Sequence, residues 1–444
     1  MSVKNIEYLR SVFKNGLCTR CGTCVGLSSG AIRFIDIEEN YRPEQVGDLT
    51  DELANRIWTG CSAKKIPMAL LNEYSFGQTE SNNEYIGYYK KLGIAYAEDS
   101  EIRRNSASGG LLSTILLWLL ETEEVQGIVT TRMSNTSPWK PETFIATKKE
   151  EVKKAAQSKY LITSVNQVLP QIQEFEGCLA YVGLPCQVHS IRKLQIANDP
   201  SVKNIKYIFG PFCGNTLHFT SIKMLLRSYG YKEHTGIEYL AFREGEWPGK
   251  MVINMNDGKK IELPKFHANY LIPFSMMKRC LLCTDFTNEL TDISGGDAWA
   301  PEYEERGKGF SLAIVRSKSG NRLFENLVRE GKIHFNPIGP DEAIKMHSHG
   351  YDFKKRGAYI RIGFRRLLKL DTPDDGRASH SFHFTRYFVE IIITALFYIS
   401  GFKISRLLMS KISPKYMGWL FIHTRSIWKY FTKGIKRRGL NAST

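Results

Sequence analysis

Residues 15–32 read NGLCTRCGTCVGLSSGAI, and this stretch decides how the first part of the chain folds. It places Cys18, Cys21 and Cys24 at two-residue intervals in a turn-rich segment. Three thiolates on one loop, whose amides can donate hydrogen bonds to sulfide, are typical of a four-iron cluster. Zinc sites usually combine C-x2-C with a distant second pair, so a zinc knuckle or three structural cysteines is the weaker alternative.

A fourth thiolate has to come from elsewhere in the chain. Ser28 stands where a bacterial ferredoxin run has its next cysteine, but that cysteine ligates the other cluster of a two-cluster ferredoxin. We therefore expect one four-iron, four-sulfur (4Fe-4S) cluster in this region and not two. The best remaining donor nearby is Cys61, in WTGCSAKK, which is assigned by elimination.

The other five cysteines lie further along the chain. Cys280 and Cys283 form a C-x2-C pair, and Cys186 and Cys213 each follow an apolar, strand-like run. Strand ends gather at one rim of an open α/β sheet, which would bring these four thiols together as a second site. The alternative is a set of unrelated core cysteines, because only one pair is local. Cys178 has no such position and is expected to be a small buried residue.

Length and cysteine usage restrict the class of protein. The chain of 444 residues is long enough for two or three domains with a large core. Its first 16 residues are polar and charged, so we expect no secretory signal and a cytoplasmic location. Because the cytosol is reducing, nine cysteines there indicate metal ligation or redox chemistry and not disulfides.

The pattern along the chain predicts three parts. Residues 1–80 are turn-rich and carry four of the cysteines, and residues 85–372 alternate strand-like with helical runs, which favours a mixed α/β (α+β) domain. The strand-like runs are 127–133, 178–184, 205–212, 250–255 and 311–317, and the helical runs are 109–124, 221–230 and 320–331. Residues 370–381 look like a hinge of turn formers leading into a tail over 376–444.

The stretch RRNSASGGLLSTILLWLLE, residues 103–121, joins a Ser/Gly loop to a long apolar helical run. Backbone N–H groups at such a helix start suit a phosphate or pyrophosphate. The candidate binding residues are Ser106, Ser108, Gly109 and Gly110. The plainer alternative is that one serine caps the helix and the glycines allow close packing.

Eight motifs together resemble the family of beta subunits of coenzyme F420-reducing hydrogenases and dehydrogenases. They are CTRCGTC, RRNSASGGLLS, SKYLITS, YVGLPCQV, FCGN, FREGEWPGK, CLLCTDFTNELTDISGGDAW and GFSLAIVRSKSGNRLF, over about residues 10–345. The resemblance implies an iron–sulfur flavoprotein. It would have a ferredoxin-like 4Fe-4S domain over 1–80 and a mixed α/β domain, binding FAD and a second 4Fe-4S cluster, over 85–372.

The same resemblance assigns residues to the cofactors. The SASGG loop and Ser158, Lys159 and Tyr160 would hold FAD, and Cys186, Cys213, Cys280 and Cys283 would hold the second cluster. Lys159 would offset pyrophosphate or reduced-flavin charge, and Tyr160 would pack on a ring. An exposed loop lysine beside a core tyrosine is the alternative.

Further residues near these motifs have less specific signals. His189 is a candidate proton donor, although a histidine in this position is more often structural. Arg243, Trp247 and Lys250 are candidates to line an anionic substrate or the flavin edge, or they belong to a Gly-Pro-rich strand connection.

These assignments predict an FAD- and 4Fe-4S-dependent oxidoreductase. A flavin converts between one-electron and two-electron chemistry, so the expected route runs from the N-terminal cluster through the second cluster and FAD to a substrate. Expected partners are ferredoxin or another redox protein and the deazaflavin coenzyme. Relatives in bacterial polysaccharide gene sets suggest a role in surface polysaccharide biosynthesis. The alternatives are an electron-relay subunit that serves a partner hydrogenase or dehydrogenase, and a metal-free scaffold.

The tail holds most of the excess positive charge. Residues 376–444 contain 12 lysines and arginines and one acid, giving +11 of the chain's net +16, so we expect no nucleic-acid binding by the chain as a whole. Residues 387–402 fall short of the roughly 20 apolar residues of a spanning helix. Beyond them, basic residues alternate with aromatic and aliphatic ones: Lys403, Arg406, Lys411, Lys415, Arg425, Lys429, Lys433 and Lys436 with Leu407, Leu408, Trp419, Phe421, Trp428 and Phe431.

This alternation predicts an amphipathic helical tail that attaches peripherally to the anionic inner face of the cell membrane. The alternative is a pair of helices packed on the core or on a partner subunit, because amphipathicity also serves ordinary packing.

Overall fold

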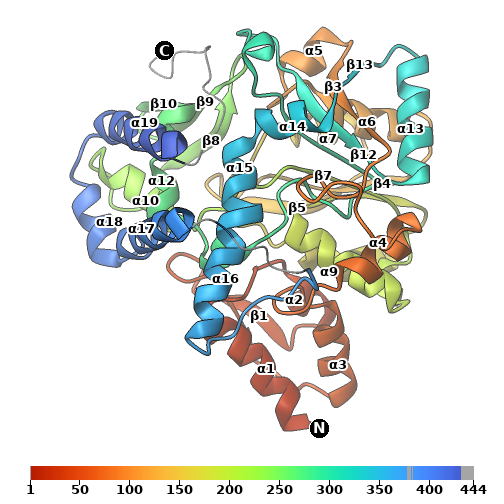
Figure 1. Cartoon of the computed structure of the whole chain (residues 1–444), viewed down its shortest axis with the longest axis horizontal. Coiled ribbons are helices and arrows are strands. Elements are labelled where there is room, and N and C mark those ends of the chain that lie inside the picture. Colours follow the sequence, from red (N-terminus) through yellow and green to blue (C-terminus); the bar gives the residue numbers. More distant parts are fainter. Residues whose placement is uncertain (1, 378–381, 383, 432–444) are drawn as a thin grey trace.

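The computed structural model describes residues 2–377, 382 and 384–431. A large sheet runs through the upper part of the molecule in Figure 1, with a smaller sheet beside it and the N-terminal segment below. The C-terminal helices lie outside the smaller sheet. The mixed α/β prediction is confirmed.

The large sheet has eight strands in the order β13-β3-β12-β11-β7-β6-β4-β5. Its central strands β4, β6, β7 and β11 are parallel to one another, and the remaining neighbours are antiparallel. The strands are β3 (Lys91–Ala97), β4 (Gly127–Met133), β5 (Pro141–Ala146), β6 (Leu179–Val182), β7 (Ile205–Pro211), β11 (Ile293–Asp297), β12 (Ser311–Val315) and β13 (Ile333–Pro337). The carboxyl ends of the parallel strands therefore share one edge, where α/β proteins bind ligands.

Helices cover both faces of this sheet. Along β7, Tyr207 and Phe209 pack in one apolar cluster and Ile208 in another, because successive strand residues point to opposite faces. The first cluster contains α6 (Leu111–Glu121) and α13 (Lys318–Arg329), and the second contains α4 (Met68–Phe76), α8 (Leu169–Glu174) and α9 (Pro185–Ile196). Short helices α5 (Ser100–Arg104), α7 (Lys149–Lys154), η1 (Val165–Val168), η2 (Pro200–Val202) and η4 (Pro301–Tyr303) connect these elements.

The smaller sheet has the order β10-β9-β8 and is antiparallel throughout. Its strands are β8 (Ile237–Glu244), β9 (Lys250–Met255) and β10 (Lys260–Pro264). It packs with α10 (Thr220–Arg227) and α12 (Leu271–Ser275) around a core of its own, and α11 (Lys265–Ala268) follows β10 directly. Each of the five expected strand runs contains its strand, and each of the three expected helical runs overlaps its helix, although α10 and α13 begin one and two residues before their runs.

The N-terminal segment comprises α1 (Ser2–Lys14), α2 (Thr23–Leu27), the hairpin β1 (Ile32–Ile35) and β2 (Arg42–Gln45), and α3 (Asp51–Gly60). Leu27, Ile32 and Ile57 belong to the same apolar cluster as α9, so this segment shares a core with the large sheet. The domain boundaries at residues 80, 85 and 372 stay predictions.

The C-terminal part begins with α14 (Pro340–Met346), α15 (Ser348–Tyr351), the π-helix η5 (Asp352–Gly357) and α16 (Ala358–Leu367). The expected hinge of turn formers stays a prediction: residues 371–377 form no helix or strand, and two of them contact the rest of the chain, since the Asp374 carbonyl accepts a 2.8 Å hydrogen bond from the Ile66 amide and Asp375 accepts one from Thr284. Residues 378–381 of that prediction lie outside the described residues. The chain ends in α17 (Phe384–Ser400), α18 (Lys403–Met409) and α19 (Pro414–Phe431).

The expected burial of Cys178 is wrong. Cys178 is exposed, because β6 starts only at Leu179 and the chain turns at Gly177, whose φ is +105°.

Candidate functional site

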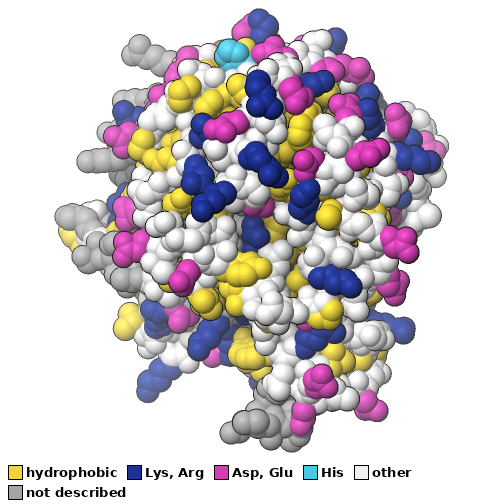
Figure 2. All heavy atoms as spheres, turned by 90° about the vertical axis from the view of Figure 1, so that its right-hand side faces the viewer, with side chains coloured by type: hydrophobic (Ala, Val, Ile, Leu, Met, Phe, Trp, Pro, Cys, Tyr) yellow, Lys and Arg dark blue, Asp and Glu magenta, His cyan; other side chains and the backbone are white. Residues whose placement is uncertain are grey.

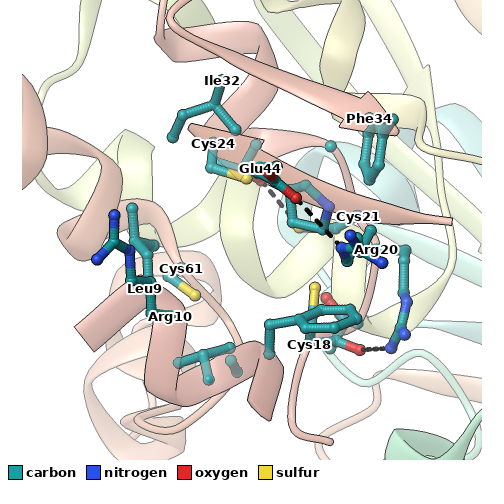
Figure 3. Close-up of a pocket in the computed structure, with 18 of the residues that line it drawn as sticks. Leu9, Arg10, Cys18, Arg20, Cys21, Cys24, Ile32, Phe34, Glu44 and Cys61 are labelled. Atoms are coloured by element: carbon teal, nitrogen blue, oxygen red, sulfur yellow. Dashed lines mark hydrogen bonds and ion pairs between the residues drawn. The ribbon is translucent and has the colours of Figure 1, made fainter. Parts of the chain in front are cut away.

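The four N-terminal cysteines come together around one cavity. Cys18 lies between α1 and α2, Cys21 and Cys24 flank the start of α2, and Cys61 directly follows α3. All four line a cavity of about 410 Å³. Figure 3 shows their sulfur atoms facing a common space, with Arg10 of α1 and Phe34 of β1 at its sides.

The spacing of the sulfur atoms favours a cluster over a single metal ion. Tetrahedral zinc with Zn–S bonds of about 2.3 Å brings its sulfur ligands to about 3.8 Å from one another. Within the described part of the chain, no three cysteine sulfurs lie within 4.8 Å of one another. A four-iron cluster is larger than one ion and needs more widely separated thiolates. Cys18, Cys21, Cys24 and Cys61, arranged around one cavity, suit such a cluster better than a single zinc ion.

The surroundings of these thiols also suit a cationic group. Burial, reinforced by the charge of Cys21, raises the pKa of the Cys61 thiol to about 12, and burial raises the pKa of Cys24 well above its usual value. Such thiols stay protonated in the absence of a metal, because each thiolate would be desolvated beside others. They are therefore better suited to ligate iron than to act as free nucleophiles.

A second group of cysteines converges at the carboxyl edge of the large sheet. Cys186 is the second residue of α9, Cys213 follows β7, and Cys280 and Cys283 lie in and after η3 (Lys278–Leu282). Burial raises the pKa of Cys186 well above its usual value, and the charges of Cys213, Cys283 and Cys280 raise it further. The four predicted ligands are thus electrostatic neighbours.

The two groups adjoin each other at the start of α9. The Ser190 hydroxyl lies 3.7 Å from the Cys21 sulfur and donates to the Cys186 carbonyl at 3.4 Å. Ser62, next to Cys61, donates to the same carbonyl at 2.8 Å. The charge of Cys21 contributes to the raised pKa of Cys186. Both donor sets therefore meet across one turn of helix.

Lys354 is a residue of this second group that the sequence did not indicate. It lies in the π-helix η5, it is buried, and its ammonium donates to the Cys280 carbonyl at 3.4 Å. Although burial opposes its charge, the charges of Cys283, Cys280 and Cys213 raise the pKa of Lys354. In the sequence it stands in KKRG, which is typical of an exposed basic turn.

A cavity of about 460 Å³ lies beside the second cysteine group. Both segments predicted to bind FAD line it, through Ser106, Ser108 and Gly110 on one side and Ser158, Lys159 and Tyr160 on the other. Gly109, the fourth predicted residue of that loop, is not among the residues that line the cavity. Cys213 also lines the cavity, so the second cysteine group has one member on its wall.

The SASGG loop is held against the sheet by its own serines and glycines. Ser108 donates to the Phe310 carbonyl at 2.8 Å, and the Gly109 amide donates to Ser311 at 2.9 Å. Gly110 is the N-cap of α6 with a φ of +82°, and no side chain caps this helix end. The first amides of α6 are thus left without a side-chain partner at the cavity, as an anion site requires.

Lys159 is not an exposed loop lysine. Its ammonium donates to the carbonyls of Ala155, Ala156 and Gln157, which follow α7. Removal from water lowers the pKa of Lys159 to about 7. Tyr160 packs edge-on against Phe242 of the smaller sheet, with ring centroids 5.5 Å apart.

The smaller sheet closes the cavity through a buried ion pair. Arg243 of β8 donates to both carboxylate oxygens of Asp297, at 2.9 and 3.0 Å, and Trp247 donates to one of them at 2.8 Å. Although burial opposes its charge, Arg243 lowers the pKa of Asp297 to about 2. Arg243 lines the cavity, whereas Lys250 pairs with Glu262 on the surface. The sequence did not indicate Lys265 and Trp299, which also line the cavity with the ammonium 3.8 Å from the ring centroid.

His189 lies outside the set of residues that line the cavity. Its Nε2 is 2.9 Å from the Asp285 carboxylate, and both side chains are buried. Asp285 in turn accepts hydrogen bonds from the amides of Asn288 and Glu289. These contacts suit a structural role, and the catalytic role of His189 stays an untested prediction.

The C-terminal part supplies cavity residues that the sequence did not suggest. His347, His349 and Arg425 line the cavity, and Arg425 of α19 donates to the His349 ring at 2.7 Å. Nothing in their local sequence distinguishes them from other basic residues of the tail.

Comparison with known proteins places this geometry in a family, described as coenzyme F420 hydrogenase/dehydrogenase, beta subunit. Residues 94–170 match the N-terminal part of this family, and residues 177–341 match its C-terminal part. The two matches together cover more than half of the chain.

Individual relatives agree with this match. The chain is 26% identical to the beta subunit of the coenzyme F420 hydrogenase of Methanothermobacter thermautotrophicus, over 65% of this chain and 99% of the relative. It is 24% identical to one subunit of the F420H2 dehydrogenase of Methanosarcina mazei, over 74% of this chain and 87% of the relative. It is 26% identical to the coenzyme F420-dependent sulfite reductase of Methanocaldococcus jannaschii over 78% of this chain, which spans only 52% of that protein.

Among solved structures, a chain of the F420-reducing nickel–iron hydrogenase complex from Methanosarcina barkeri has the same fold. Its TM-score is 0.52 at 20% identity, with 67% of this chain and 99% of that chain covered.

The SASGG loop gives a test that needs no cofactor. We expect Gly109→Ala to lower the free energy of unfolding by about 1–3 kcal/mol, because a Cβ there would lie 2.7 Å from the Ala95 carbonyl oxygen and 2.8 Å from the Ser311 amide. Gly214→Ala, in the same cavity wall with nothing within 4 Å, is the matched control and should change stability by no more than about 0.5 kcal/mol. Urea unfolding measures both, and equal losses would show that the loop is not packed as described.

Proposed function

The chain belongs to the family of coenzyme F420 hydrogenase/dehydrogenase beta subunits, and from this we propose that it is an iron–sulfur flavoprotein oxidoreductase. In this proposal electrons pass from two 4Fe-4S clusters through FAD to a substrate or coenzyme.

One observation carries the proposal: two groups of four cysteines adjoin each other, and the second has a member on the wall of a large cavity. Ser190 and Ser62 connect the groups, and Cys213 faces the cavity. Such a series suits electron transfer over short steps, which isolated structural cysteines do not require.

Each group of four cysteines would hold one iron–sulfur cluster. Cys18, Cys21, Cys24 and Cys61 would ligate one cluster, and Cys186, Cys213, Cys280 and Cys283 the other. When bound, the clusters would supply one-electron exchange and FAD would exchange either one or two electrons.

The chain itself supplies charge and water exclusion around the cavity. Lys159 and the open end of α6 offer positive charge to a pyrophosphate. Tyr160, Phe242 and Trp299 offer ring surfaces, and the Arg243–Asp297 pair fixes the smaller sheet over the cavity. Lys354 places a buried positive charge against the second cysteine group. This charge would favour the reduced state of a cluster bound there, because the reduced cluster is more negative.

The reaction partner is drawn from the relatives. The three relatives described above are named for coenzyme F420, so this deazaflavin is the first candidate for the substrate of the cavity. Ferredoxin or another redox protein is the proposed partner at the N-terminal cluster. The proposed location is the cytoplasm, and the suggested role in surface polysaccharide biosynthesis depends on the sequence resemblance alone.

An electron-relay subunit is an equally supported alternative. The chain covers nearly all of the hydrogenase beta subunit, which is one component of a larger enzyme. Mixing the purified chain anaerobically with reduced coenzyme F420 distinguishes the two. Multiple turnovers with a small-molecule acceptor indicate an enzyme, whereas a single stoichiometric reduction indicates a subunit that needs its partner.

The first prediction concerns the fourth ligand of the N-terminal cluster. We expect Cys61→Ala to lower the iron content by about half and to remove one electron paramagnetic resonance signal, because only one donor set contains Cys61. FAD content should not change, since the flavin residues lie beyond Tyr85. Cys178→Ala, which alters the exposed cysteine, is the control and should keep all iron. Full iron in the Cys61 variant would show that the fourth ligand lies elsewhere.

The second prediction concerns pH. Burial lowers the pKa of Lys159 to about 7, so its side chain is mostly a neutral amine above that pH, whereas a bound pyrophosphate favours the charged ammonium. Binding then takes up a proton, and the Kd for FAD should rise as pH increases above about 7, by up to about tenfold per unit. Lys159→Gln should flatten this dependence, and Lys153→Gln, at an exposed lysine of α7, should not. A wild-type Kd that is constant from pH 6 to 9 would contradict the role of Lys159.

A further inference from the structure

The C-terminal helices carry most of the exposed apolar surface of the molecule. Of the 24 large apolar side chains exposed in the described part of the chain, 15 lie between residues 384 and 427. They are Phe384, Phe388, Ile391, Ile392, Leu396, Tyr398, Ile399, Phe402, Ile404, Leu407, Leu408, Tyr416, Trp419, Leu420 and Ile427, here called the tail surface. A patch of this extent marks an interaction site.

The tail surface lies on one side of the molecule. Its helices α17, α18 and α19 stand together on the left of Figure 1, outside the smaller sheet. The face on the other side, shown in Figure 2, carries acidic and basic side chains intermixed, with apolar ones between them. The face in Figure 2 thus mixes charges of both signs, whereas 15 of the exposed large apolar side chains lie on the tail helices.

The helices are fixed to the core by their opposite faces, so core packing does not account for the tail surface. In α17, Glu390 is buried and pairs with Arg361 and Arg386, and Arg386 also pairs with Asp352. In α19, Met417 joins the core of the smaller sheet. The alternative of helices packed on the core is therefore correct for one face of each helix and leaves the other face unexplained.

The exposed charged residues of the tail helices themselves are positive, although Glu39 from the β1–β2 turn lies near Arg406. The one acid of residues 376–444 is Glu390, which is buried, whereas Lys403, Lys411 and Lys415 are exposed. Apolar side chains with lysines beside them suit an interface of acyl chains and anionic headgroups.

The lengths of the helices favour lying in the interface. In the described ranges no single helix is long and apolar enough to cross a membrane, although α17 and α18, bent by 79° at their junction, pass that test as a pair. Phe402 and Ile404 stand exposed at this bend. Trp428, Lys429 and Phe431 lie where side chains are not described, and Lys433 and Lys436 lie outside the described residues.

We propose that the tail surface binds an anionic lipid bilayer peripherally, with its apolar side chains among the acyl chains and Lys403, Lys411 and Lys415 at the phosphates. This inference does not depend on the redox function. The proposal agrees with the membrane attachment predicted from the sequence and names the side chains that would contact the lipid.

The test is flotation of the full-length holoprotein with vesicles of phosphatidylcholine alone or with 30% phosphatidylglycerol, at low and high salt. Point variants are needed, because truncation before α17 would leave Arg361 without Glu390. We expect wild-type protein to float with the anionic vesicles and salt to weaken this binding. Circular dichroism and an unchanged midpoint of urea unfolding show that each variant is folded.

Two variants and their controls separate the contributions. Phe402→Ser/Ile404→Ser/Leu408→Ser should reduce binding at least about tenfold on anionic vesicles. The control variant Leu70→Ser/Tyr74→Ser/Val328→Ser, at exposed apolar residues outside the tail, should not. Lys403→Gln/Lys411→Gln/Lys415→Gln should reduce binding about tenfold or more on anionic vesicles alone. Lys153→Gln/Lys318→Gln/Lys332→Gln, at exposed lysines elsewhere, is the matched control.

Several outcomes would overturn the proposal. The first is that wild-type protein floats with neither kind of vesicle. The second is that the control variants lose as much binding as the tail variants. The third is that the Phe402→Ser/Ile404→Ser/Leu408→Ser variant binds lipid normally. Light scattering adds one more: a wild-type dimer that becomes a monomer in the apolar variant, without lipid binding, would assign the tail surface to a second copy of the chain.

Discussion

The first turn of α9 is the contact on which the rest of the site depends. It follows β6 at the carboxyl edge of the parallel strands, so Cys186 is delivered to the same edge as Cys213 after β7. Its Cys186 carbonyl accepts hydrogen bonds from Ser62 and Ser190, and Ser190 reaches the Cys21 sulfur. A single turn thereby positions both cysteine groups, and the shared apolar core of α9 with the N-terminal segment keeps them in contact.

Buried polar contacts hold the loop behind the C-x2-C pair. Glu289 pairs with Lys355 of η5 and with Arg377, and Asn288 donates to the Gly183 carbonyl at 2.7 Å. Asp285 pairs with His189 of α9. Removing one partner of a buried ion pair is costly, so these contacts hold the loop in one arrangement. The same network connects η5, and with it Lys354, to the cysteines. A rigid frame of this kind suits electron transfer, because little has to move when charge arrives.

The sequence allowed the prediction of those features that local spacing encodes. The cysteine triplet, the C-x2-C pair and the thiols after strand-like runs could be assigned because strand ends of a parallel sheet share an edge. Residues brought in by distant elements could not. Lys354 looks like part of an exposed basic turn, and Arg425 reaches the cavity from the tail. Arg243 was a candidate from its motif, but its pairing with Asp297 between the two sheets was not foreseen. Cys178 was assigned to the core because the apolar run begins with it. The strand itself starts one residue later, at Leu179, and leaves Cys178 exposed.

The central claim is that one chain holds two clusters beside a flavin cavity. Quantifying iron, acid-labile sulfide and flavin in full-length protein purified anaerobically tests whether the chain holds both clusters and a flavin. Two four-iron clusters and one flavin predict about eight irons, about eight sulfides and about one FAD per chain. About four irons would remove one of the two sites. No iron and no flavin after anaerobic reconstitution would contradict the account as a whole.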